Sequence, residues 1–117
     1  TLEEHGLEFM FIKDNYPNLI KIVGNDLDTD IWPEDTDLFQ TDLWFFDSEH
    51  NKKQLMAELD IYSTFFKKGT TILFDDIHLN DEMNYVWDEL KLGRWGHLDC
   101  FDATDPLHYS GFGVVRV

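Results

Sequence analysis

The sequence is poor in cysteine, in proline and in long apolar runs, and each shortage excludes a class of protein. Cys100 is the single cysteine, so no internal disulfide can form, and we expect a reducing, cytoplasmic compartment. No apolar run approaches the roughly 20 residues that a membrane-spanning helix needs, so no membrane span is expected. The first four residues, Thr1-Leu2-Glu3-Glu4, lack the positive charge of a signal peptide. No linker rich in Pro, Gly or Ser interrupts the chain.

Basic residues are also scarce. The chain holds 9 Lys plus Arg against 24 Asp plus Glu, a formal net charge of -15. Such a surface repels nucleic acid and anionic membranes, so we expect neither as a partner. The 117 residues are 43% hydrophobic, which is typical of a globular protein, and the length predicts one domain over residues 1–117.

The first part of the chain mixes apolar segments with an acidic loop. A helix is predicted over residues 2–15, ending before Tyr16-Pro17, although a strand is the alternative because apolar residues alternate at positions 7, 9 and 11. The apolar run Leu19–Val23, closed by Gly24, predicts a strand. Residues 26–42 are acidic and loop-like.

The second part alternates strands and helices. Residues 43–46 are apolar at every position, which predicts a strand covered on both faces. Further strands are predicted at residues 70–74, 97–101 and 112–117, and helices at residues 51–66 and 80–91. This order predicts an α/β fold with a mostly parallel sheet and an antiparallel pair of C-terminal strands at its edge.

Acidic residues follow two of the predicted strands at the point where each strand ends. Asp47 follows residues 43–46, and Asp75 and Asp76 follow residues 70–74. If these strands are parallel neighbours, their ends lie about 5 Å apart at the edge where α/β sheets bind ligands. The three carboxylates then predict a Mg²⁺ site, with Mn²⁺ or Ca²⁺ as alternatives. His50, three residues after Asp47, is the candidate proton acceptor.

For any single one of these acids, helix capping or a solvated loop is the ordinary role. The metal hypothesis therefore depends on all three carboxylates and His50 meeting at one edge. His78 is interpreted as a loop histidine rather than a ligand, and His5, His97 and His108 show no pattern that indicates a role.

Two segments together resemble a known family. Asp47-Ser48-Glu49-His50 and, after a helix, the run from Phe66 to Ile77 resemble class I S-adenosylmethionine-dependent O-methyltransferases. The most similar group is the metal-dependent branch with macrocin-type sugar O-methyltransferases and cephalosporin-hydroxylase-like proteins. Catechol O-methyltransferase is more distantly similar. The resemblance implies a Rossmann-like methyltransferase fold and a small-molecule hydroxyl acceptor such as a sugar or vicinal diol.

The resemblance also implies roles for single residues. Asp47, Asp75 and Asp76 match the ligands of Mg²⁺, which holds two vicinal hydroxyls of the acceptor, and His50 matches the general base. The residues that match cofactor-binding positions for S-adenosylmethionine are Gly24, Asn25, Asp26 and Ser48.

The chain departs from the family pattern at three positions and in extent. Ser48 stands where the family often has Gly, Thr70 replaces the second Gly of a turn, and Glu58 replaces a helix Asp. The resemblance covers only the family's C-terminal half, so we expect its first two strands and its glycine-rich loop to precede residue 1. The resemblance therefore implies that residues 1–117 form part of a methyltransferase domain.

Other hypotheses remain beside the enzyme. One is a non-catalytic acidic α/β module that binds a basic protein. Another is a receiver-type phosphoacceptor domain, in which the acid pair precedes the single Asp, the reverse of the order here. The partner can be a second copy of the chain, in a homo-oligomer, or a complementary N-terminal segment, and the sequence does not decide between them.

Overall fold

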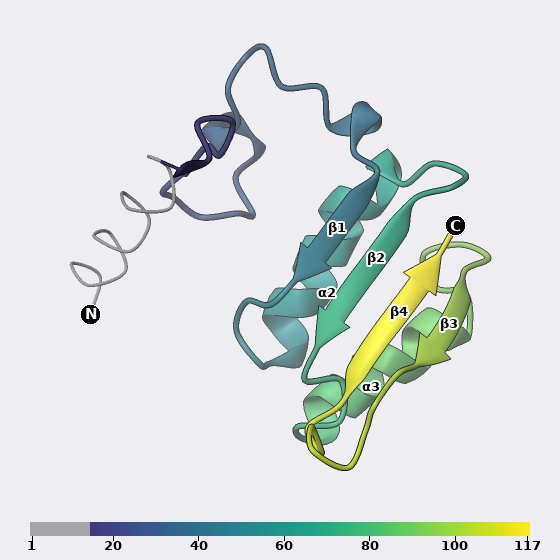
Figure 1. Cartoon of the computed structure of the whole chain (residues 1–117). Coiled ribbons are helices and arrows are strands. Elements are labelled where there is room, and N and C mark those ends of the chain that lie inside the picture. Colours follow the sequence, from purple (N-terminus) through teal and green to yellow (C-terminus); the bar gives the residue numbers. More distant parts are fainter. Residues whose placement is uncertain (1–14) are drawn as a thin grey trace. The chain divides into compact units, whose positions relative to one another are not determined.

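The computed structural model describes residues 15–117 (Figure 1). The helix predicted over residues 2–15 lies outside the described residues except for its last position. The chain divides into two compact units, residues 1–34 and residues 35–117, and each is described by itself. Whether the two make one domain, as the sequence predicts, stays a prediction.

In the first unit, the strand predicted at Leu19–Val23 is wrong. The backbone makes a turn at Pro17, with Leu19 N donating to Tyr16 O at 2.9 Å, and no ladder forms at residues 19–23. A strand is stable only when its backbone groups form hydrogen bonds with a neighbouring strand. A run of apolar residues does not by itself provide that neighbour. The acidic loop that follows contains the short 3₁₀ turn η1 (Thr29–Ile31), which the Asp28 side chain caps.

The second unit is a small α/β domain with four strands and two helices. In chain order its elements are η2 (Leu38–Gln40), β1 (Leu43–Phe46), α2 (Lys52–Tyr62), η3 (Ser63–Phe65), β2 (Thr71–Asp75), α3 (Asp81–Lys91), β3 (Asp99–Asp102) and β4 (Phe112–Arg116). The α/β class predicted from the sequence is therefore confirmed for this unit.

The sheet is mixed, with the strand order β1-β2-β4-β3. β1 and β2 are parallel, whereas β4 is antiparallel to both β2 and β3. The prediction of a mostly parallel sheet is wrong for the strand pairings. Because β4 lies between β2 and β3 and is antiparallel to both, two of the three strand pairs are antiparallel. The predicted antiparallel pairing of the last two strands is confirmed, with β3 at the edge of the sheet.

Both helices begin at an asparagine cap. Asn51 Oδ1 accepts from Gln54 N, and Asn80 Oδ1 accepts from Met83 N, each at 2.8 Å. These bonds satisfy backbone donors that have no partner within the first helical turn. Among the described residues, no helix combines the length and the apolar character needed to cross a bilayer.

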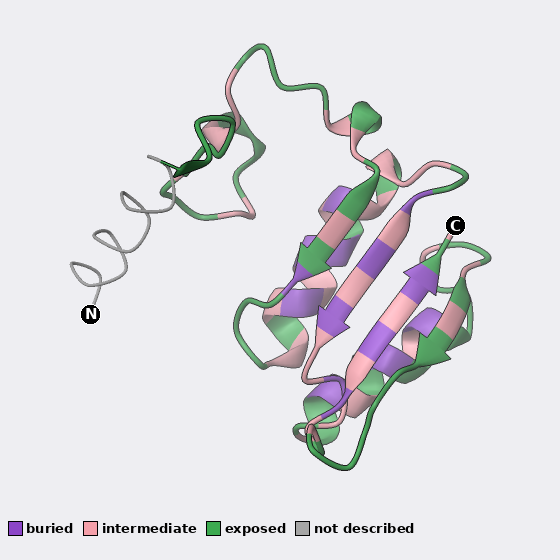
Figure 2. Cartoon of the chain, viewed as in Figure 1, coloured by how far each residue is buried: buried purple, intermediate pink, exposed green. Residues whose placement is uncertain are grey.

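The two helices pack on the same face of the sheet (Figure 1). The core lies between them and the sheet, where Ile72, Phe74 and Val115 are at most 1% exposed. On the opposite face, Phe45 is 55% exposed, so the prediction that β1 is covered on both faces is wrong. Figure 2 shows the resulting alternation of burial along the strands. Side chains alternate between faces, and four apolar residues in a row do not indicate whether a second layer covers the other face.

One ion pair links the loop after β2 to β3. His78 Nε2 lies 2.5 Å from Asp102 Oδ2, and His78 Nδ1 lies 2.7 Å from Asn84 Oδ1. The hydrogen bond to Asp102 raises the pKa of His78 above 6.5. Hydrogen bonds from Thr104 first and His78 second lower the pKa of Asp102 from 3.8 to about 2.

These shifts predict how the pair stabilises the fold as pH changes. The His78 contribution is complete below pH 6.5 and is lost as pH rises through its higher folded pKa. The Asp102 contribution is complete above pH 3.8 and is lost as pH falls toward about 2. We therefore expect His78→Gln to cost most between about pH 4 and 6.5, by no more than ~1 kcal/mol because both groups are partly solvated. Urea unfolding of both proteins at pH 5.5 and pH 8.5 measures this, and an equal cost at the two pH values would contradict it.

Candidate functional site

The candidate site lies at the edge of the sheet where β1 and β2 end. The parallel register pairs Phe46 with Phe74, so the residues that follow, Asp47 and Asp75, lie at the same edge of the sheet. β3 runs in the same direction as β1 and β2, because both antiparallel ladders involve β4. The loop from β3 to β4, residues 103–111, therefore starts at this edge as well.

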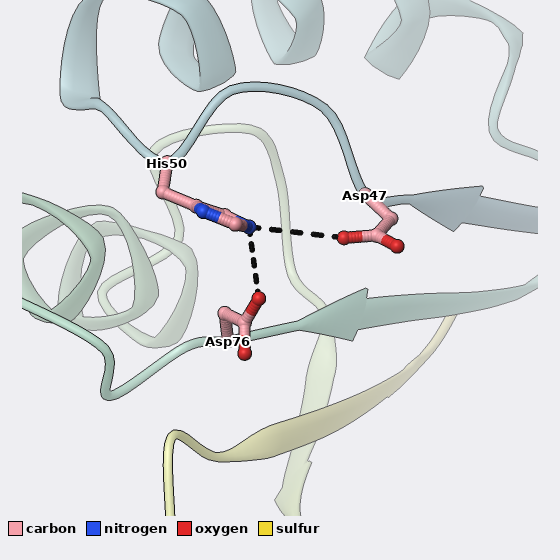
Figure 3. A group of neighbouring side chains, drawn as sticks. All are labelled: Asp47, His50 and Asp76. Atoms are coloured by element: carbon pink, nitrogen blue, oxygen red, sulfur yellow. Dashed lines mark ion pairs between the residues drawn. The ribbon is translucent and has the colours of Figure 1, made fainter. Parts of the chain in front are cut away.

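One cluster of side chains joins the loop after β1 to the loop after β2. His50 Nε2 lies 2.8 Å from Asp76 Oδ2 and 3.8 Å from Asp47 Oδ1 (Figure 3). One ligand atom of each residue lies within 4.8 Å of the others, the spacing of a metal-binding group. Asp76 is the least accessible of the three, with its side chain 15% exposed against 42% for His50 and 44% for Asp47.

A second cluster at the same edge contains Asp75, Asp76 and His108. His108 Nε2 lies 2.7 Å from Asp75 Oδ1 and 3.9 Å from Asp76 Oδ1. The structure thus divides the predicted carboxylates, with Asp47 in one cluster, Asp75 in the other and Asp76 in both. The two clusters share the Asp76 carboxylate, with His50 near its Oδ2 and His108 nearer its Oδ1.

The backbone holds Asp76 in this central position. Its φ angle is 59°, in the left-handed region that non-glycine residues seldom adopt. Its N–H donates to Gly111 O at 2.8 Å, and Ser110 Oγ donates to its Oδ1 at 2.6 Å. Strained residues of this kind persist where surrounding contacts hold them, and they cluster at functional sites.

A hydrogen bond between loops positions His50. Asn80 caps α3 through its Oδ1, and its Nδ2 donates to the backbone carbonyl of His50 at 3.0 Å. A second link runs from Lys52 N to Glu82 Oε1 at 3.4 Å. The loop that carries His50 is therefore attached to the start of α3, which keeps the imidazole beside Asp76.

His108 is a candidate site residue that the sequence interpretation missed. Asp105 forms the turn that presents it, since Asp105 Oδ1 accepts from Leu107 N at 2.7 Å and from His108 N at 3.0 Å. The hydrogen bond to Asp75 raises the pKa of His108 above its usual value. A signal was available, because the predicted direction of the last two strands already placed their connecting loop at the edge with Asp47 and Asp75.

The predicted cofactor residues lie in two places. Ser48 follows Asp47, and its Oγ donates to Glu58 Oε1 at 2.5 Å; Gln54 Nε2 donates to the same oxygen at 2.9 Å. Glu58 is 1% exposed, so Ser48 helps to satisfy a buried carboxyl group. The other three predicted residues, Gly24, Asn25 and Asp26, belong to the first unit, and their contact with a cofactor stays a prediction.

The arrangement concentrates negative charge with little positive charge to balance it. Among the ion pairs of residues 15–117, Asp47, Asp75 and Asp76 pair only with histidines. Neighbouring carboxylates without a cation repel each other, and a divalent ion removes that penalty. Chemically, the edge can bind a cation through oxygen atoms and move a proton through an imidazole nitrogen.

Comparisons of the chain with protein-family models, with curated proteins and with solved structures found no match.

Proposed function

We propose that this chain is the metal- and acceptor-binding part of an S-adenosylmethionine- and Mg²⁺-dependent O-methyltransferase that acts on a small molecule with vicinal hydroxyls. One observation supports this above all. Carboxylates from the ends of two adjacent parallel strands, Asp47 and Asp76, meet His50 within metal-binding distance. The antiparallel last strand, β4, is a second feature that the resemblance to this family predicts.

The residues at the edge fit Mg²⁺. Mg²⁺ prefers carboxylate oxygens and keeps several waters, and Mn²⁺ accepts the same ligands. Asp47 and Asp76 would hold the ion, with Asp75 as the third carboxylate. Asp47 is partly exposed, which leaves room for water or for acceptor oxygens.

The proposed reaction is an in-line transfer of a methyl group from a sulfonium to an acceptor oxygen, so it needs alignment and a deprotonated hydroxyl. A bound Mg²⁺ supplies the lowered pKa of a hydroxyl that it coordinates. His50 takes the hydroxyl proton at Nδ1, because Nε2 carries the hydrogen that it donates to Asp76 Oδ2. The charge that the imidazole gains lies 2.8 Å from Asp76 Oδ2, which stabilises it. Asn80 orients the ring by holding its backbone carbonyl.

For the cofactor, the proposal assigns Gly24, Asn25 and Asp26 to the turn that contacts the adenine of S-adenosylmethionine. Ser48 is the remaining candidate, and its bond to Glu58 makes it a support for the loop that carries Asp47 and His50. A cytoplasmic location is part of this proposal, since S-adenosylmethionine is an intracellular metabolite.

Metal titration tests the proposal. We expect Asp75→Asn/Asp76→Asn to weaken Mn²⁺ binding at least tenfold, because two anionic oxygen ligands become neutral amides. Free Mn²⁺ is measured by electron paramagnetic resonance, with Mg²⁺ as competitor and with or without S-adenosylmethionine.

The matched control is Asp88→Asn/Asp99→Asn, which removes the same charge from two exposed positions outside the clusters. The control should bind Mn²⁺ as the wild type does. Equal affinity in all three proteins would remove the proposed metal site.

A further inference from the structure

Asp75 is the predicted metal ligand that the structure keeps apart from Asp47. It belongs to the second cluster of the candidate site, with Asp76 and His108. Two hydrogen bonds hold its Oδ1 atom there, since His108 Nε2 lies 2.7 Å away and Asp76 N donates at 3.0 Å. One of the two oxygens that Asp75 has for a metal ion is therefore already bound within the protein.

The contact with Asp75 decides which role His108 has. An ionised carboxylate only accepts hydrogen bonds, so the His108 nitrogen beside it carries a hydrogen. A ring nitrogen that carries a hydrogen has no lone pair for a metal ion, and Mg²⁺ prefers oxygen ligands. In this arrangement His108 and a metal ion are rivals for Asp75 and not two parts of one centre.

The loop that carries His108 is attached at its end and uncovered at its tip. Asp76 N donates to Gly111 O at 2.8 Å, which fixes the last residue of the β3–β4 loop beside the site. The residues on either side of His108, Leu107 and Tyr109, are 95% and 86% exposed, and the His108 side chain is 43% exposed. A rotation of the imidazole away from the site would therefore disturb little packing.

We propose that His108 and the metal ion compete for Asp75, so that the β3–β4 loop restrains metal binding at the candidate site. The inference rests on the proposed function, because it takes Asp75 as the third carboxylate of the Mg²⁺ site. When the ion binds, Asp75 exchanges the hydrogen bond from His108 for a bond to the ion. The hydrogen stays on the imidazole, which moves out to solvent.

Competition of this kind acts in both directions. Removing the His108 side chain should tighten metal binding, and the metal ion should release His108, because the two effects are linked by one free energy of coupling. A role for His108 as a metal ligand predicts the opposite sign, a weaker affinity once the imidazole is removed. The sign of the change in affinity therefore separates the two roles.

Mn²⁺ titration of His108→Ala tests the competition. The variant lacks the hydrogen-bond donor, so we expect it to bind Mn²⁺ about 3- to 10-fold more tightly than the wild type, the usual worth of one partly solvated hydrogen bond to a charged group. His97→Ala is the matched control, since its side chain is 99% exposed and outside both clusters. It should bind Mn²⁺ as the wild type does. Circular dichroism checks that each variant keeps its fold.

An Asp75→Asn background shows whether the effect passes through Asp75. Without that carboxylate the imidazole and the ion have no shared partner, so His108→Ala should change the Mn²⁺ affinity less than about twofold. A gain in affinity that persists in this background would assign the effect to the charge of the imidazole acting at a distance. That result would overturn the competition.

Nuclear magnetic resonance observes the release of His108 without any assay of activity. In two-dimensional ¹H–¹³C spectra of the full chain, the ring signals of His108 are assigned by their absence from His108→Ala. We expect them to move as Mg²⁺ is added, while the ring signals of His97 stay in place. His108 signals that do not move while the site fills with Mg²⁺ would overturn the competition.

The outcomes separate this inference from the proposed function. Unchanged or weaker Mn²⁺ binding by His108→Ala, in a chain whose binding depends on Asp75 and Asp76, overturns the competition alone. Equal affinity of the wild type and Asp75→Asn/Asp76→Asn removes the proposed metal site, and the competition with it. Tighter binding by His108→Ala that disappears in the Asp75→Asn background supports both.

Discussion

Replacing His50 with Gln is expected to slow methyl transfer by about 10²- to 10⁴-fold, the usual contribution of a positioned general base. Gln keeps a polar side chain of similar length but cannot accept a proton at neutral pH. The reaction is measured with radiolabelled S-adenosylmethionine, Mg²⁺ and catechol as a vicinal-diol probe. His50 Nε2 faces Asp47 and Asp76, so the loss should appear in the rate of transfer more than in binding of the acceptor.

Two controls separate the base from other roles of His50. Mn²⁺ affinity should stay within a fewfold of the wild-type value, whereas a large loss would make His50 a metal ligand instead. His97→Gln is the matched variant, because the His97 side chain is 99% exposed and lies 4.0 Å from its partner Asp99. It should transfer methyl groups at the wild-type rate. Methyl transfer that is as fast after His50→Gln as before would contradict the role of His50 as the base.

The place of the candidate site was predictable because it follows from chain order. Asp47 and Asp75 each follow an apolar run, and a helix lies between the two runs, which predicts parallel neighbours with their ends at one edge. The structure contains that unit, with β1 and β2 in parallel register. His50 comes with the same loop, so its position beside this edge needed no long-range information.

The division of the carboxylates was not predictable in the same way. Asp75 is the last residue of β2, and its side chain follows the alternation of the strand. Asp76 has a positive φ angle, and because Asp adopts this conformation in only a minority of cases, the residue type alone does not indicate it. The His108 partner of Asp75 comes from 33 residues further along the chain, through a loop whose shape depends on Asp105.

The remaining errors share a physical cause. Leu19–Val23 and residues 43–46 are both short apolar runs, yet the first makes no ladder and the second is β1 with one uncovered face. Local hydrophobicity predicts that a segment favours burial, but it carries no information on which partner covers it. The order of β3 and β4 in the sheet likewise depends on contacts between distant segments.

Replacing Gly113 with Ala is expected to destabilise the second unit by about 1–3 kcal/mol, the usual cost of adding a methyl group to a filled core. Gly113 lies in β4 on the side that faces α3. A Cβ atom there would lie 2.7 Å from Cη2 and Cζ3 of Trp87, closer than packed carbon atoms come. Trp87 is 3% exposed and packs against Phe74 with ring centroids 6.3 Å apart, so its ring has little room to move.

A double-mutant cycle identifies the contact as the cause. In a strand, Gly→Ala alone would stabilise the protein by about 0.4–1 kcal/mol, because Ala has less freedom in the unfolded chain. Trp87→Phe removes the ring atoms that a Cβ at position 113 would meet. In that background we expect the cost of Gly113→Ala to fall toward zero or to reverse its sign, with urea unfolding as the measurement. An unchanged cost would show that the backbone of β4, and not the indole ring, excludes a side chain at position 113.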